Sequence, residues 1–114
     1  MSEKEDALTK TYDLILWLFP QISKFPRDYR YILGNRIENG LLDVMEQLIE
    51  ARYTRDKAGL LQSANLALEK LRYLVRLAKD LKLFNTKKYE YISREINQTG
   101  IYVGAWLKKV KSTG

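Results

Sequence analysis

Apolar residues between positions 60 and 81 recur without a break at alternating steps of four and three. The set is Leu60, Ala64, Ala67, Leu71, Leu74, Ala78 and Leu81. This spacing places all members on one face of an α-helix, since three or four residues return the helix to the same side. A helix of this kind gains most of its stability by burying that face against other elements. The pattern therefore predicts a helix that packs against partner helices.

Three further segments have the same helical period, and no segment alternates like a β-strand. Before a connection at residues 23–25, the apolar positions are Leu8, Tyr12, Ile15, Phe19 and Ile22. From Pro26 to about Tyr53, they are Leu33, Ile37, Leu41, Val44 and Leu48. After a connection at Asn85 and Thr86, they are Tyr89, Ile92, Ile96, Thr99, Val103, Trp106 and Val110. Short connections favour antiparallel neighbours, so we expect an all-α, up-down-up-down four-helix bundle, with residues 1–114 as one domain.

Small and capping residues add detail to this bundle. Either Asn85 or Thr86 has a side chain that caps a helix N-terminus, and the third helix is expected to start near Asp56. Gly34 and Gly40 lie inside the second helix, where each lowers helix stability by about 1 kcal/mol relative to alanine. We therefore expect a close helix contact at both glycines.

The residue types exclude most kinds of catalytic or metal site. The chain contains no cysteine and no histidine, which removes thiolate nucleophiles, the commonest general base and the commonest metal ligands. Paired carboxylates remain among Glu38, Asp43 and Glu46, but neighbouring arginines make ion pairs their expected use. No glycine-rich phosphate loop is present. We expect a protein that is not an enzyme and has no metal or cofactor.

Two segments bear on localisation. The longest apolar run, residues 14–19, is far shorter than the roughly 20 residues that span a membrane. Residues 1–6 are acidic and polar, unlike a signal peptide. The expected location is the cytoplasm, without membrane association.

Positive charge is concentrated in the second half of the chain. Residues 1–57 hold nine basic and ten acidic side chains, whereas residues 58–114 hold eleven and four, so the formal net charge is +6. On a helical wheel, Arg72, Arg76 and Lys79 share one face of the third helix. Further cations follow at Lys82, Arg94, Lys108, Lys109 and Lys111. Such a face either binds phosphates or is an ordinary solvated surface, and Tyr73 within it either stacks on bases or packs in an interface.

A second apolar row lies on the outside of the predicted bundle. Leu66, Tyr73 and Leu77 face away from the core stripe of the third helix. The expected outward residues of the fourth helix are Tyr91, Ile101, Tyr102 and Ala105. Adjacent exposed apolar rows commonly form interfaces, so we expect self-association through Leu66, Tyr73, Leu77, Ile101 and Ala105.

Two stretches resemble one known family. Residues 64–80, ANLALEKLRYLVRLAKD, resemble the third-helix pattern of the four helix bundle protein family. Residues 89–97, YEYISREIN, with Gly100 and VGAWLK at 103–108, resemble its fourth-helix signature. This family includes the ribosomal-RNA intervening-sequence proteins and Avd, the accessory variability determinant of diversity-generating retroelements.

The resemblance implies a homopentameric barrel of four-helix protomers with a basic surface for RNA or DNA. For Avd it also implies a reverse transcriptase partner and support of mutagenic cDNA synthesis. Arg72 and Arg76 match the basic spacing of the family, and the wheel adds Lys79, Arg94 and Lys108. Two alternatives stay open. One is an intervening-sequence-type bundle of unknown role, and the other is a self-associating structural bundle without nucleic-acid function.

Overall fold

The computed structural model describes residues 3–113 and the side chains of residues 6–112. Met1 and Ser2, which belong to the segment compared with a signal peptide, lie outside this range. Within it the helices are α1 (Glu3–Ile22), α2 (Arg27–Tyr29), η1 (Arg30–Gly34), α3 (Asn35–Tyr53), α4 (Lys57–Asp80) and α5 (Thr86–Thr113). The described residues form no β-strand, so the predicted all-α, four-helix fold is confirmed. None of these helices is long and apolar enough to cross a membrane.

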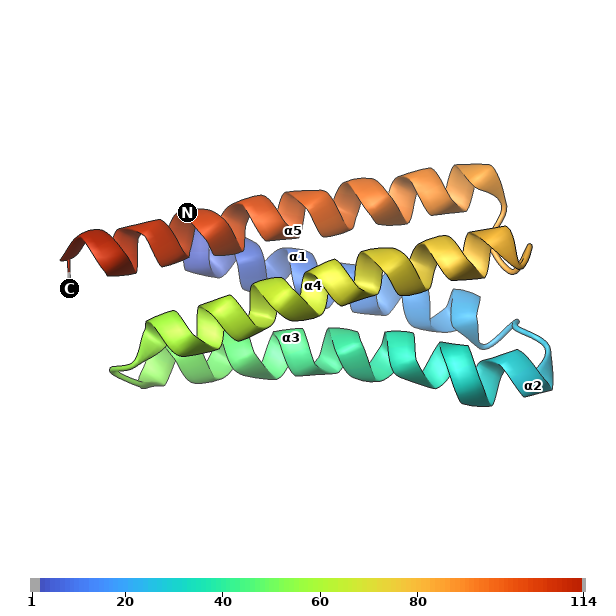
Figure 1. Ribbon diagram of the computed structural model, residues 1–114, viewed down its shortest axis with the longest axis horizontal. Helices are drawn as coiled ribbons and strands as arrows, with labels where there is room; N and C mark the ends of the chain where they lie inside the picture. Colours follow the sequence, from blue (N-terminus) through green and yellow to red (C-terminus); the bar gives the residue numbers. More distant parts are fainter. Residues whose placement is uncertain (1–2, 114) are drawn as a thin grey trace.

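The long helices form an elongated bundle of 46 × 23 × 20 Å. Helix α3 packs against α1 and α4, and α5 packs against α4 and α1 (Figure 1). Going round the bundle, the order is therefore α1, α3, α4, α5, with α1 and α4 on opposite corners. The short α2 and η1 lead into α3, and η1 is a π-helical turn.

Connections end the helices with specific contacts. The Lys57 ammonium donates to the carbonyl oxygens of Ala51 (2.6 Å) and Thr54 (2.9 Å), at the C-terminus of α3. Lys82 has a φ of 65°, and this left-handed turn closes α4. The Asn85 side chain accepts a 2.8 Å hydrogen bond from the Lys88 amide, so the predicted cap of α5 is confirmed.

Two predicted apolar stripes are confirmed. In α3 and its lead-in, the five predicted residues Leu33, Ile37, Leu41, Val44 and Leu48 are all buried. In α5, the central predicted residues Ile92, Ile96, Thr99, Val103 and Trp106 are buried. Tyr89 and Val110, at the two ends of that stripe, are partly buried against the core.

The other two stripes are confirmed only in part. Four predicted residues are buried, namely Ile22, Ala64, Leu71 and Ala78, and the others are offset by about one position. In α4 the buried residues are Leu61, Ala64, Leu68, Leu71, Val75 and Ala78. The predicted Leu60, Ala67 and Leu74 lie at the core edge, and Leu81 is exposed. In α1 the buried residues of the described part are Ala7, Thr11, Leu14, Leu18 and Ile22. The predicted Tyr12 is exposed, because both helices carry two adjacent apolar rows and packing selects between them.

Both glycines of the second predicted helix lie at close contacts, as expected. A Cβ placed on Gly34 would approach Ile22 Cγ2 to 2.7 Å, and one on Gly40 would approach Leu71 Cδ2 to 2.9 Å. Neither space admits a methyl group without movement. Gly34 therefore brings η1 close to α1, and Gly40 brings α3 close to α4.

Candidate nucleic-acid interface

Helix α4 presents two arginines one turn apart on its exposed side. Arg72 Nε lies 3.6 Å from a carboxylate oxygen of Glu69, and Arg76 Nε lies 3.9 Å from one of Asp80. All four side chains are at least 42% exposed, and exposed pairs within a helix contribute only about 0.3–0.5 kcal/mol. Displacing either carboxylate by a phosphate therefore costs little free energy. The predicted cluster remains able to bind anions.

Helix α5 completes this face. Lys79 Nζ lies 5.3 Å from the centre of the Tyr89 ring, so the third cation of α4 rests over an aromatic of α5. A Cβ on Gly100 would lie 3.2 Å from Arg72 Nη2, so the glycine leaves room for the guanidinium beside the α5 backbone. We call Arg72, Arg76 and Lys79 with Tyr73 and Tyr89 the basic face.

A hollow of about 230 Å³ lies within the basic face. It is lined by Glu69, Arg72, Tyr73, Arg76 and Tyr89. Two guanidinium groups and two phenol rings thus border one recess, with a carboxylate that can accept hydrogen bonds. Guanidinium groups bind phosphate oxygens in pairs, and aromatic rings stack on bases. The recess offers both kinds of contact to a nucleotide.

The remaining predicted cations do not join this cluster. Lys108 lines a separate hollow of about 480 Å³ near the end of α5, with Gly104, Leu107, Lys111 and Ser112. Arg94 lies over Tyr91 at 5.9 Å, and the Tyr91 ring is 4.6 Å from that of Trp17 in α1. Arg94 therefore belongs to the α1 side of α5. The structure brings Arg72, Arg76 and Lys79 together and separates Arg94 and Lys108 from them.

The predicted outer apolar residues are mostly exposed. Leu66, Tyr73, Leu77 and Ile101 all present large apolar surfaces to solvent. Ala105 is half-buried. Tyr91 and Tyr102 were predicted to face outward but pack against the core, which is a correction. Their rings turn toward the bundle because α5 packs against both α4 and α1.

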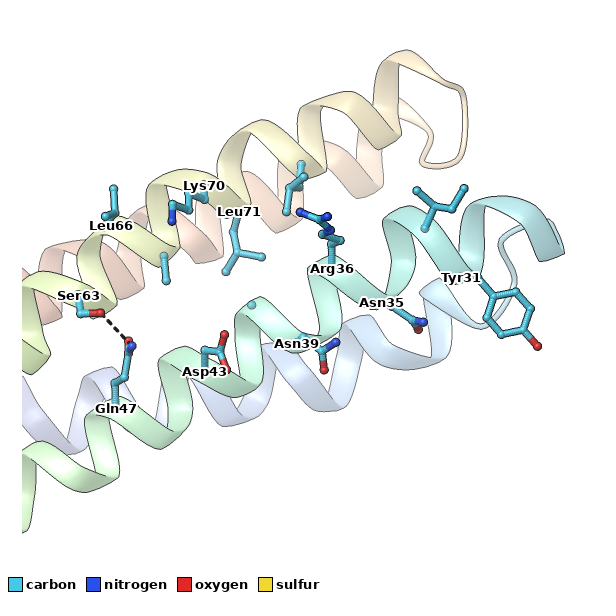
Figure 2. A pocket seen from close by; sticks show the side chains of 14 residues that line it. Tyr31, Asn35, Arg36, Asn39, Asp43, Gln47, Ser63, Leu66, Lys70 and Leu71 are labelled. Carbon is cyan, nitrogen blue, oxygen red and sulfur yellow. Dashed lines mark hydrogen bonds between the residues drawn. The ribbon is translucent and has the colours of Figure 1, made fainter.

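Sequence reasoning missed a groove between α3 and α4. Its volume is about 470 Å³, and its lining is Tyr31, Ile32, Asn35, Arg36, Asn39, Gly40, Asp43, Gln47, Ser63, Leu66, Ala67, Lys70, Leu71 and Leu74 (Figure 2). The Gln47 amide donates a 2.9 Å hydrogen bond to the Ser63 hydroxyl across one end. The available signal was the row of small residues Gly40, Ser63 and Ala67, which leaves a depression where two helices meet. We call this feature the α3–α4 groove.

The described carboxylates do not gather into a metal-binding group. Within the part of the chain that the structure describes, no group of three acidic side chains could hold a metal ion. Partial burial raises the pKa of Glu38, and the charge of nearby Arg30 opposes this rise. Within the described range, no ion pair joins Glu38, Asp43 or Glu46 to an arginine, so that expectation is wrong.

A comparison with known families gives a match that covers most of the chain. A family model described as bAvd-like matches residues 7–110. The matched range reaches from Ala7 in α1 to Val110 near the end of α5, and includes the basic face and the α3–α4 groove. No curated protein gives a significant match to this sequence.

Proposed function

This chain belongs to the bAvd-like family, and from that premise we propose that it is an Avd-type accessory protein of a diversity-generating retroelement. In this proposal it is a cytoplasmic homopentameric scaffold without catalytic activity. It holds template RNA or cDNA together with the retroelement reverse transcriptase during mutagenic cDNA synthesis.

One observation carries the nucleic-acid part of the proposal. Arg72, Arg76 and Lys79 gather on one exposed face beside Tyr73 and Tyr89, with a recess between them. Cations of this kind bind the phosphate backbone, and the exposed Tyr73 ring, with the half-buried Tyr89 ring beside it, gives bases a surface to stack on. Phosphate contacts carry no sequence information, so the binding is largely independent of sequence. In an oligomer the face is repeated once per protomer, which multiplies the modest charge of each chain.

The first test changes Arg72 and Arg76 together to glutamate. Affinity for single-stranded RNA is measured by filter binding across a salt series. For single strands the slope of log K against log salt is about −0.7 per phosphate contacted, so losing two contacts reduces its magnitude by about 1.4 per site. We expect the double variant to lose most binding at low salt while retaining wild-type helicity and oligomeric mass.

Lys24 and Arg55 provide the matched control. Both are exposed cations in connections between helices, and changing both to glutamate alters the formal charge by the same amount. We expect this control to retain the salt slope of the wild type. Equal loss in both variants would show that net charge alone governs binding, and it would refute the role of the basic face.

The second test concerns the protein partner. The chain is co-expressed with the reverse transcriptase encoded nearest to its gene, and the complex is purified at moderate salt. Co-purification supports the Avd-type role. Recovery of the chain without the enzyme would contradict it and favour the intervening-sequence-type alternative.

A further inference from the structure

Helix α1 has an apolar row that the described residues leave exposed. Tyr12 is 54% exposed and Leu16 is 60% exposed, and their spacing of four residues puts them on one side of the helix. Asp13 is exposed beside them. The nearest described cation of α1, Lys10, turns toward α5 and binds Glu95 at 3.1 Å. The exposed side of α1 is thus apolar and acidic.

The α3–α4 groove is also apolar but carries the opposite charge. Leu66, at 57% exposure, and Ile32, at 72%, are uncovered at its margins, and its floor includes Gly40 and Leu71. Figure 2 shows Arg36 reaching from α3 toward α4, with Lys70 on the facing side. These two cations outnumber Asp43, the acidic residue of the lining. The groove is therefore an apolar depression with a basic margin.

The two features lie at the same height along the bundle. Gly34 of η1 meets Ile22 of α1, and Gly40 of α3, six residues later, meets Leu71 of α4. Because α1 and α3 run antiparallel, six residues back from Ile22 is Leu16, which is level with Gly40 and Leu71. One helical turn further, Tyr12 is level with the part of α4 near Leu66.

We propose that the exposed side of α1, at Tyr12, Asp13 and Leu16, docks into the α3–α4 groove of a second copy of this chain. Leu16 then lies over Gly40 and Leu71, Tyr12 packs beside Leu66, and Asp13 comes within reach of Lys70. This inference rests on the oligomeric scaffold of the proposed function and assigns its interface. It replaces Tyr73, Leu77, Ile101 and Ala105 with residues of α1 and α3, and keeps Leu66.

The contact joins two different surfaces, so it is heterologous and repeats from copy to copy. Helix α3 lies between α1 and α4 in the order round the bundle, so the outward directions of the two surfaces differ by less than a half-turn about the bundle axis. Successive copies therefore turn in one sense. Because the two surfaces lie at the same height, each copy is not displaced along the bundle axis relative to the previous one. The copies therefore close into a ring of parallel bundles instead of growing as a filament.

The absence of cysteine from the sequence makes crosslinking a direct test. Chains carrying Tyr12→Cys and Leu66→Cys are co-expressed with different tags, purified, and treated with a short bis-maleimide. We expect a crosslinked dimer that contains both tags, and no dimer from either variant alone. A chain carrying both substitutions should give a ladder that ends at the mass of the intact oligomer.

Ile101→Cys is the matched control. Ile101 is as exposed as the two test positions, but it lies on α5, outside the proposed contact. We expect no crosslink when it is paired with Leu66→Cys. Crosslinking of Ile101→Cys, crosslinking of Tyr12→Cys with itself, or no crosslink between Tyr12→Cys and Leu66→Cys would each overturn the inference.

A charge exchange gives a second measurement. Asp13→Lys should raise the concentration at which the oligomer dissociates by about fivefold, equivalent to about 1 kcal/mol. Adding Lys70→Asp in the same chain should reverse most of this change, and failure to do so contradicts the pairing. The outcome is separable from nucleic-acid binding. A chain that crosslinks as expected but binds no RNA refutes the proposed function alone, and one that binds RNA without crosslinking refutes this interface alone.

Discussion

Substituting alanine for glycine should have opposite effects on stability at two helical positions. Gly34 and Gly104 both have helical neighbours, and alanine is about 1 kcal/mol more favourable than glycine inside a helix. At Gly104 the added Cβ meets no described atom within 4 Å apart from its chain neighbours and the nearby backbone of its own helix. Gly104→Ala therefore keeps the whole gain, and we expect it to stabilise the protein by about 1 kcal/mol.

At Gly34 the added methyl group meets the core. The backbone there is helical, with φ −58° and ψ −46°, so the same gain of about 1 kcal/mol applies. The Cβ would lie 2.7 Å from Cγ2 of Ile22, which is fully buried. That methyl is attached to the stiff branched carbon of isoleucine and moves only if χ1 or the backbone moves. Overpacking of this kind costs about 1–3 kcal/mol, and the fixed contact places Gly34→Ala near the upper value. The net effect is a loss of about 2 kcal/mol.

Urea unfolding followed by circular dichroism measures both variants. Protomer concentration is held constant, because association contributes to the apparent stability of an oligomer. The two variants should differ by about 3 kcal/mol, in the order Gly104→Ala, wild type, Gly34→Ala. Equal stabilisation by both substitutions would show that η1 does not approach α1 at Gly34 and would refute the packing described for this end of the bundle.

Three further measurements test the core and its charges. When association is absent, Leu68→Ala should lower the free energy of unfolding by about 2–5 kcal/mol, and Leu66→Ala by under about 0.5 kcal/mol. Equal losses would contradict the assignment of Leu68 to the buried face of α4. A double-mutant cycle on Lys10 and Glu95, 3.1 Å apart and partly buried, should give a coupling of about 1 kcal/mol, lost if the pair does not form. Burial raises the pKa of Glu38, so its ionised form opposes folding and stability from this group increases as pH falls through that raised pKa. Glu38→Gln should therefore raise stability at pH 7 more than at pH 4, and the reverse pH trend would refute the assignment.

The sequence predicted the α3 core because its buried row is the longer of two. Ile37, Leu41 and Val44 belong to a row that runs along the whole helix. The adjacent row begins only at Leu42, because Glu38 interrupts it one turn earlier. The longer row indicates which face is buried. Tertiary packing only has to bring that face inward.

In α4 the helical period allows two buried faces. Leu60, Ala67 and Leu74 form one row, and Leu61, Leu68 and Val75 form another one position further along. Neighbouring residues point about 100° apart around a helix, so the two rows face different directions. The sequence of α4 alone does not determine which row is buried. Contacts with α3 and α5 decide it, including the approach of Leu71 to Gly40.

Clustering of site residues was predictable only within a helix. Arg72 and Arg76 are four residues apart, so they share a face whatever the helix packs against. Arg94 depends on how α5 is rotated, and its contact with Tyr91 places it on the α1 side. The α3–α4 groove depends on the relative height of two helices, which a periodic pattern does not contain.

The rotation of α4 also determines whether assembly and nucleic-acid binding can coexist. Arg72 lies beside Gly100 of α5, whereas Lys70 and Leu71 line the groove beside α3. The basic face and the α3–α4 groove therefore occupy opposite flanks of one helix. A second copy docked in the groove covers Leu66 and leaves Arg72 and Arg76 open to solvent. A ring built this way carries one uncovered basic face on every protomer, so nucleic acid can contact several faces at once. Binding through linked sites raises affinity well above that of a single face, and the wild-type oligomer should therefore bind long RNA more tightly than short RNA. Equal affinity for RNAs that span one face and several faces would show that the faces act separately.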